Sequence, residues 1–470
     1  MNYSESEERL EDSEDTTALG TLLPEIVTLP PGPRSRALAA ELAEYESPNV
    51  TYLAEDFPVF WAEARGANVR DADGNVYVDL TAAFAVAGTG HAHPRVVEAV
   101  SRQAGRLLHG MGDVHPPEIK TALLRKLAEI TPGALKRTIL ASSGGEAVEA
   151  ALKTAAIATG KPRVLAFHGG YHGLTYGALS VSAREDFRGP FANQLGNLAV
   201  FAPYPYPYRS PFGRDPEEVG AATLRWVEHL LDTPGTASEG IGAILVEPVQ
   251  GRGGDVVPPD AFLPGLRRIC DERGLLLILD EVYTGFGRTG RWFACEHRSV
   301  VPDLLVVGKA LTGGLPFAAC IGTEEAMGRW PRSTGEAIHT STFLGNPVGC
   351  AAALASIAVL EEERLVERSA ELGGRIRARL EEATRGHPRV GEVRGVGMMI
   401  GVELVRDRET RTPAPELVGR VMTEALRRGV ILLGGGIHGN VLSLSPPFVI
   451  TGEQADAALG VVEEVLTGIA

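Results

Sequence analysis

Residues 241–249 (IGAILVEPV), 275–281 (LLLILDE) and 304–309 (LLVVGK) are three short apolar runs that decide the fold class. A stretch with helical character, AFLPGLRRICDERG at 261–274, separates the first two runs. Strands that are apolar at almost every position have both faces covered, and strands that alternate with helices form a mostly parallel sheet. The sequence therefore predicts an α/β domain with helices on both faces of its sheet.

The same pattern continues on both sides of these runs. RTIL at 137–140 precedes a helical stretch at 146–160, and RVLAFH at 163–168 follows it. A hairpin is expected at 67–80, and helices alternate with short strands after about residue 351. We therefore expect four segments: an acidic mobile leader at 1–30, a segment at 31–84 that joins the small domain, a large domain at 85–345 and a C-terminal small α+β domain at 346–470.

Charge and composition argue against several classes of function. The 470 residues include 45 Lys and Arg against 60 Asp and Glu, and the net charge of −15 disfavours a nucleic-acid partner. No apolar run approaches the length of about 18 residues that a membrane span needs. The first fifteen residues carry seven acids and one arginine, unlike a secretory signal, so a cytoplasmic location is expected. The four cysteines form no CxxC pair and are expected to be buried, reduced thiols.

Three strand ends are followed by residues that could bind a ligand or take part in a reaction. Ser143-Gly144-Gly145 opens a helix after the first strand, where free backbone amides and the helix dipole favour a phosphate. Taken alone, this stretch also fits a plain serine cap with glycines for the turn. Asp280 and Lys309 each follow an apolar strand, and either could belong to a structural ion pair. Together, the three ends form the set needed to hold a pyridine aldehyde phosphate.

Ordered motifs between about residues 50 and 455 resemble the class III, fold-type I aminotransferases, which use pyridoxal 5'-phosphate (PLP). The motifs are DADGNVYVDLTAAFAVAGTGHAHP (71–94), SSGGEAVEAALK (142–153), FHGGYHG (167–173), VEPVQG (246–251), LILDEVYTGFGRTG (277–290), PDLLVVGKALTGGLP (302–316) and TFLGNP (342–347). The resemblance implies a large, mostly parallel seven-stranded sheet domain and a smaller α+β domain. It also implies a homodimer with shared active sites.

The resemblance further implies a role for individual residues. Lys309 would hold PLP as a Schiff base and move the proton, while Asp280 would keep the pyridine nitrogen protonated. The implied reaction is a ping-pong transfer of an amino group from an amine or amino acid to an oxo acid or aldehyde. The remaining cofactor contacts that it implies are Ser143, Gly144 and Gly145 on the phosphate, Thr342 from the second subunit, Tyr171 and Val282 on the two ring faces, and Glu247 near the phenolic side.

Four positions bear on the substrate. Arg252 stands where relatives that act on 4-aminobutyrate or ornithine have an acid, and Ser443 lies near a position where they have an arginine. Leu174 replaces a further arginine, and Phe84 falls at an apolar pocket position. We expect a more apolar pocket than in those relatives, suited to bulky or hydrophobic amines. Arg252 is either a displaced carboxylate clamp or a structural arginine at the rim.

Other activities remain open at this point. Amino-acid racemases or epimerases and phospholyases of the same family share these motifs, because their reactions begin in the same way. A metal-dependent hydrolase is a remote alternative, since His91 and His93 form an HxH pair and Asp280 could be a later ligand. Such a site needs further histidines at strand ends, whereas His229, His297 and His387 lie in polar helical or loop contexts and His168 and His172 flank Tyr171.

Overall fold

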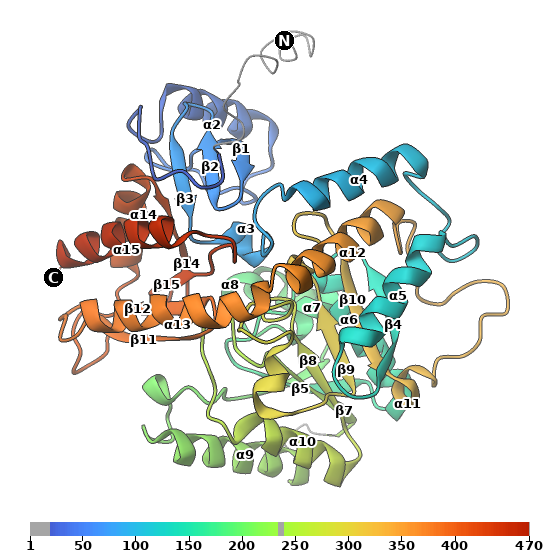
Figure 1. Ribbon diagram of the computed structural model, residues 1–470. Helices are drawn as coiled ribbons and strands as arrows, with labels where there is room; N and C mark the ends of the chain where they lie inside the picture. Colours follow the sequence, from blue (N-terminus) through green and yellow to red (C-terminus); the bar gives the residue numbers. More distant parts are fainter. Residues whose placement is uncertain (1–18, 234–238, 470) are drawn as a thin grey trace.

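The computed structural model describes residues 19–233 and 239–469. In this part of the chain, a central seven-stranded sheet has the order β4-β10-β9-β8-β7-β5-β6 (Figure 1). Strand β10 runs antiparallel to β4 and β9, and the remaining neighbours are parallel, which confirms the mostly parallel sheet. The strands are β4 (Leu135–Ala141), β5 (Arg163–Phe167), β6 (Ala199–Ala202), β7 (Ile241–Val246), β8 (Leu276–Asp280), β9 (Leu304–Val307) and β10 (Ala318–Thr323).

Helices cover both faces of this sheet. Along β7, Ala243 and Leu245 belong to the hydrophobic cluster that includes α6, whereas Ile244 and Val246 belong to the cluster on the opposite face, which includes α10. This alternation explains why the strand is apolar at every position. The helices of this part are α4 (Pro94–Arg106), α5 (Glu118–Ile130), α6 (Gly144–Thr159), α7 (Tyr176–Val181), α8 (Glu185–Arg188), α9 (Pro216–Asp232), α10 (Phe262–Arg273), α11 (Glu324–Met327) and α12 (Pro347–Glu362), with 3-10 turns at Gly189–Gln194, Pro207–Arg209, Ala294–Arg298 and Lys309–Leu311.

Two smaller sheets pack beside the central one (Figure 1). One has the order β1-β2-β3-β13, and the other has the order β11-β12-β15-β14. Because β13 pairs in parallel with β3, the N-terminal hairpin and the C-terminal third share a sheet. The elements are α2 (Pro33–Tyr45), β1 (Trp61–Arg65), β2 (Asn68–Asp71), β3 (Val76–Asp79), α3 (Ala82–Ala85), α13 (Leu365–Ala383), β11 (Val390–Val396), β12 (Met399–Leu404), α14 (Pro415–Arg427), β13 (Val430–Ile431), β14 (Leu433–Gly435), β15 (Val441–Leu444) and α15 (Gly452–Thr467).

The chain start differs in part from the expected mobile leader. Residues 1–18 of that leader lie outside the described residues. From Leu19 on, however, the chain is attached to the small sheets, because Glu25 forms an antiparallel bridge with Val76 and the Asn68 side-chain oxygen accepts the backbone N–H of Gly20. The acidic bias ends at about residue 15, and the apolar residues that follow it have surface to bury.

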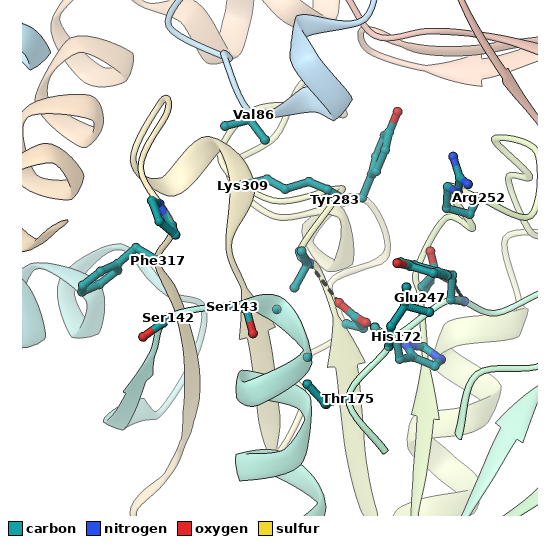
Figure 2. A pocket seen from close by; sticks show the side chains of 18 of the residues that line it. Val86, Ser142, Ser143, His172, Thr175, Glu247, Arg252, Tyr283, Lys309 and Phe317 are labelled. Atoms are coloured by element: carbon teal, nitrogen blue, oxygen red, sulfur yellow. Dashed lines mark hydrogen bonds and ion pairs between the residues drawn. The ribbon is translucent and has the colours of Figure 1, made fainter. Parts of the chain in front are cut away.

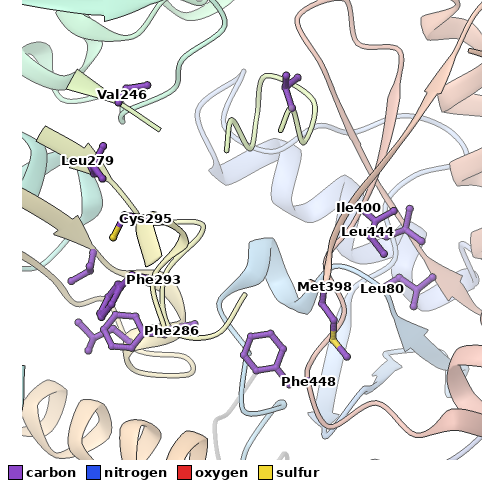
Figure 3. Packing of buried hydrophobic residues seen from close by; sticks show 14 of the residues in the cluster. Leu80, Val246, Leu279, Phe286, Phe293, Cys295, Met398, Ile400, Leu444 and Phe448 are labelled. Carbon is purple, nitrogen blue, oxygen red and sulfur yellow. The ribbon is translucent and has the colours of Figure 1, made fainter. Parts of the chain in front are cut away.

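One hydrophobic cluster extends from the central sheet into the small domain (Figure 3). The rings of Phe286 and Phe293 pack edge to face, with their centroids 5.6 Å apart. The Phe448 ring centroid lies 4.4 Å from Cζ of Arg288. The domain boundaries expected at residues 85 and 345 therefore stay a prediction, since a shared core crosses them. The cysteines are free and buried, as predicted. Within the described ranges, no helix is both long enough and apolar enough to cross a bilayer.

Candidate active site

A cavity of about 840 Å³ lies at the carboxyl ends of β8 and β9, beside the start of α6 (Figure 2). Parallel sheets bind ligands at this edge because the strand ends and helix starts converge there. Most of the predicted site residues line this cavity. They are Ser143, Gly144, Gly145, Tyr171, Leu174, Glu247, Arg252, Asp280, Val282 and Lys309.

Lys309 lies half-buried in the wall of the cavity, two residues after the end of β9. Desolvation lowers the pKa of its amine to about 8, although the carboxylates of Asp280 and Glu247 act in the opposite direction. Its backbone φ of +46° lies in the left-handed region, which side-chain-bearing residues rarely adopt and which tends to occur at functional sites. An amine with a lowered pKa is neutral more often near pH 7 and is therefore more available as a nucleophile and base.

Asp280 ends β8 and is held by two hydrogen-bond partners. Its Oδ2 lies 2.7 Å from Nδ1 of His172, and its Oδ1 accepts the backbone N–H of Val282 at 3.1 Å. Burial opposes the charge on His172, but Asp280 and Glu247 outweigh this effect and raise the pKa of the imidazole above its usual value. The carboxylate is therefore fixed in orientation before any ligand arrives.

His172 was not among the predicted site residues. The motif FHGGYHG contains it, but nothing in the local pattern indicates which strand end its ring reaches.

Glu247 follows β7 and joins two loops of the cavity wall. Oε1 accepts the backbone N–H of Tyr171 and Oε2 accepts that of Gly251, both at 2.9 Å. Burial raises the pKa of this carboxyl above its ordinary value. The first of these bonds fixes the backbone of Tyr171. The centroid of the Tyr171 ring lies 5.6 Å from that of Phe187. These bonds hold the proposed stacking tyrosine against the cavity.

The start of α6 is shaped to admit a small anionic group. Ser143 caps the helix, with its Oγ accepting the backbone N–H of Glu146 at 3.2 Å. A Cβ on Gly144 would approach Val282 to 3.2 Å, and one on Gly145 would approach the Thr175 hydroxyl to 3.1 Å. Larger side chains would crowd the helix start, where first-turn N–H groups lack helical partners. The residues here therefore fit the phosphate of PLP.

The opposite wall contains one cation among apolar groups. The Arg252 guanidinium lies 5.9 Å from the Tyr171 ring centroid, and its backbone carbonyl accepts a hydrogen bond from Arg184 at 2.7 Å. Leu174 is half exposed at the cavity mouth. Sequence reasoning missed further lining residues from other segments: Ser142, Thr175, Val86, Tyr283, Leu315, Pro316 and Phe317. The glycine-rich ALTGGLPF, just after Lys309, was the available signal for the last three.

Three predicted residues do not line the cavity of this chain. Phe84 lies in a separate apolar groove of about 270 Å³, on a turn in which residues 82–85 all have φ between +46° and +63°, whereas Val86 lines the cavity. Ser443 is buried on β15, near Asp255 and behind the cavity wall. Thr342 is exposed on the loop before α12, so any role at a cofactor depends on a second subunit.

The HxH pair binds two different carboxylates. His91 Nε2 lies 2.8 Å from Asp79, and His93 Nε2 lies 3.2 Å from Glu363. Within residues 19–233 and 239–469, no three His, Cys, Asp or Glu side chains converge as a metal site would require. Asp280 is bonded to His172 and not to either histidine of the pair.

Comparison with known proteins places this geometry in context. A family model for class-III aminotransferases matches residues 51–466. An alanine/serine racemase of Pyrococcus horikoshii is 36% identical, over 94% of this chain and 92% of its own length. A 4-aminobutyrate aminotransferase of Mycobacterium leprae is 38% identical, over 94% and 98%. Among solved structures, an (S)-enantioselective omega-transaminase from Thermomicrobium roseum superposes with a TM-score of 0.86 at 31% identity, covering 93% of this chain and 99% of that one.

Proposed function

The chain belongs to the class III aminotransferases, and we propose how its own residues carry out the PLP-dependent transfer of an amino group. When bound, PLP supplies an aldehyde that joins an amine covalently and a ring that accepts the electrons left when a proton departs. Every other part of the chemistry falls to the protein: binding, orientation, exclusion of water and movement of the proton.

Cofactor binding would use three walls of the cavity. Ser143, Gly144 and Gly145 would hold the phosphate at the start of α6. The Asp280 carboxylate would accept a hydrogen bond from the protonated pyridine nitrogen. The bond from His172 supports this role, since it leaves one carboxylate face fixed toward the cavity. Tyr171 and Val282 would contact the two faces of the PLP ring, and Glu247 would lie near its phenolic side.

Lys309 would be both the attachment point and the carrier of the proton. With its pKa lowered to about 8, its Nζ can take a proton from the substrate carbon and return it elsewhere near neutral pH. The carboxyl groups of Asp280 and Glu247 each have two hydrogen-bond partners, which fix their orientation beside Lys309.

Arg252 is the observation that carries the substrate assignment. Its side chain lines the cavity beside Tyr171, and among the described residues no carboxylate forms a salt bridge with it. A permanent cation in the cavity wall is suited to a substrate carboxylate, because the planar guanidinium binds carboxylates through two parallel hydrogen bonds. We therefore propose that the substrates are hydrophobic amino acids and the matching oxo acids.

The experiment compares Arg252→Ala with the unaltered enzyme on an oxo acid and on the aldehyde with the same side chain. Loss of a charged hydrogen-bonded pair of about 1.5–3 kcal/mol should raise KM for the oxo acid roughly 10- to 100-fold and leave KM for the aldehyde nearly unchanged. Equal effects on both acceptors would reject the clamp. Arg184→Ala is the matched control, since Arg184 contacts the backbone of Arg252 but does not line the cavity.

Racemisation is the second candidate, because a racemase is among the similar proteins. The aminotransferases of 4-aminobutyrate and 5-aminovalerate and the amine transaminase structure among the similar proteins favour transamination. Incubating the holoenzyme with a single L-amino acid separates the candidates: transamination yields one equivalent of oxo acid, a racemase yields the D-enantiomer without oxo acid, and a phospholyase releases phosphate from phosphorylated amines.

We also propose a homodimer in the cytoplasm. The dimer is supported by exposed apolar residues on two adjoining loops. Leu108 and Phe343 are 66% and 60% exposed, and Leu107, Met111 and Val114 extend the patch. The loops are joined by a hydrogen bond from Asn346 to the Leu108 carbonyl at 3.3 Å. Thr342 lies on the second loop, so a partner that covers the patch would bring this hydroxyl toward the partner's own cavity. The free cysteines support a reducing compartment.

A further inference from the structure

Tyr283 lines the active-site cavity, and the reaction described above assigns it no part. It follows β8 three residues after Asp280, beside the end of the neighbouring strand β9. Its ring centroid lies 4.3 Å from Nζ of Lys309 (Figure 2). This distance lies within the range of about 6 Å over which an aromatic face attracts an ammonium group.

The ring is held from the small domain. The Tyr283 hydroxyl donates to Ser445 Oγ at 3.1 Å, and Ser445 in turn donates to the Thr81 carbonyl at 3.1 Å. The backbone N–H of Ser445 is also fixed, since it donates to the Leu80 carbonyl at 2.7 Å. Both ends of the tyrosine are therefore anchored, one by the backbone after β8 and the other by a hydrogen-bond chain.

The other charged groups around Lys309 act in both directions. Asp280 and Glu247 favour its protonated form, whereas Arg252 and Arg288 disfavour it, and burial disfavours it most. An aromatic face differs from a carboxylate here, because it attracts the ammonium charge and has no lone pair on its face that could remove the proton. The ring can therefore stabilise the charged amine without taking its proton.

We propose that Tyr283 is a positioning residue whose ring face holds the charged Nζ of Lys309 while that amine carries the proton. The proposal rests on the assignment of Lys309 as proton carrier. Ser445 joins the Tyr283 hydroxyl to the small domain, whereas the effect on Lys309 comes from the ring face and not from this hydroxyl.

The test is the absorbance of the holoenzyme as a function of pH without substrate, which follows the proton on Nζ of Lys309 once that atom is joined to PLP. Tyr283→Leu removes the aromatic face, so the titration midpoint should fall by about 0.4 to 1.5 pH units. Tyr283→Phe keeps the face and should stay within about 0.3 units of the unaltered protein. Ser445→Ala should behave like Tyr283→Phe.

A second series removes the dependence on how well the Leu variant folds. Phenylalanine analogues with one, two and three ring fluorines at position 283 keep the shape of the ring and weaken its negative face stepwise. The midpoint should fall with each fluorine. A midpoint that ignores fluorination, or equal shifts in the Phe and Leu variants, would overturn the proposal. Failure of Lys309 itself is distinguishable, since the unaltered protein would then show no PLP adduct after borohydride reduction.

Discussion

Replacing His172 by Ala should loosen the buried carboxylate of Asp280 and weaken cofactor binding. The two side chains are 1% and 4% exposed, and Nδ1 lies 2.7 Å from Oδ2. A hydrogen bond to a charged group contributes about 1.5–3 kcal/mol. If this loss appears fully in the affinity for PLP, the dissociation constant rises about 10- to 100-fold, since 1.4 kcal/mol corresponds to a factor of ten.

The assay is titration of the apoenzyme with PLP, followed by absorbance, together with thermal unfolding of each variant. His172→Asn keeps a donor near the Nδ1 position and should recover most of the affinity. His168→Ala is the matched control, because this histidine is four residues earlier, on the same loop, with an exposed side chain. Wild-type affinity in His172→Ala, or equal losses in both Ala variants, would refute the idea that the imidazole acts by fixing Asp280.

Two further outcomes follow from the site and the exposed patch. Lys309→Ala should abolish turnover and remove the borohydride-fixed PLP adduct from the intact mass, and an adduct that persists would show attachment at another residue. Leu108→Lys combined with Phe343→Lys should convert a dimer to a monomer in light scattering, because each change places a charge in an apolar contact, whereas Val27→Lys, exposed elsewhere, should leave the mass unchanged. If the double variant still forms a dimer, the interface lies on another surface.

The sequence alone determined the positions of Asp280 and Lys309 at strand ends. A strand buried on both faces must be apolar along its length, so the first polar residue after each run marks where the strand leaves the core. Parallel strands then bring these ends to one edge of the sheet. The cap at Ser143 could be predicted for the same local reason, because a helix start needs a side-chain acceptor for its free N–H groups.

Only the tertiary structure decided which side chains meet. His172 reaches Asp280 across 108 positions, and Tyr283 reaches Ser445 across 162, through loops whose paths no periodicity encodes. Phe84 lies in its own groove, on a turn of four successive left-handed residues that the composition AAFA gives no reason to expect. Local patterns report burial and backbone propensity, whereas partner choice depends on the packing of distant segments, and that packing exists only in the folded chain.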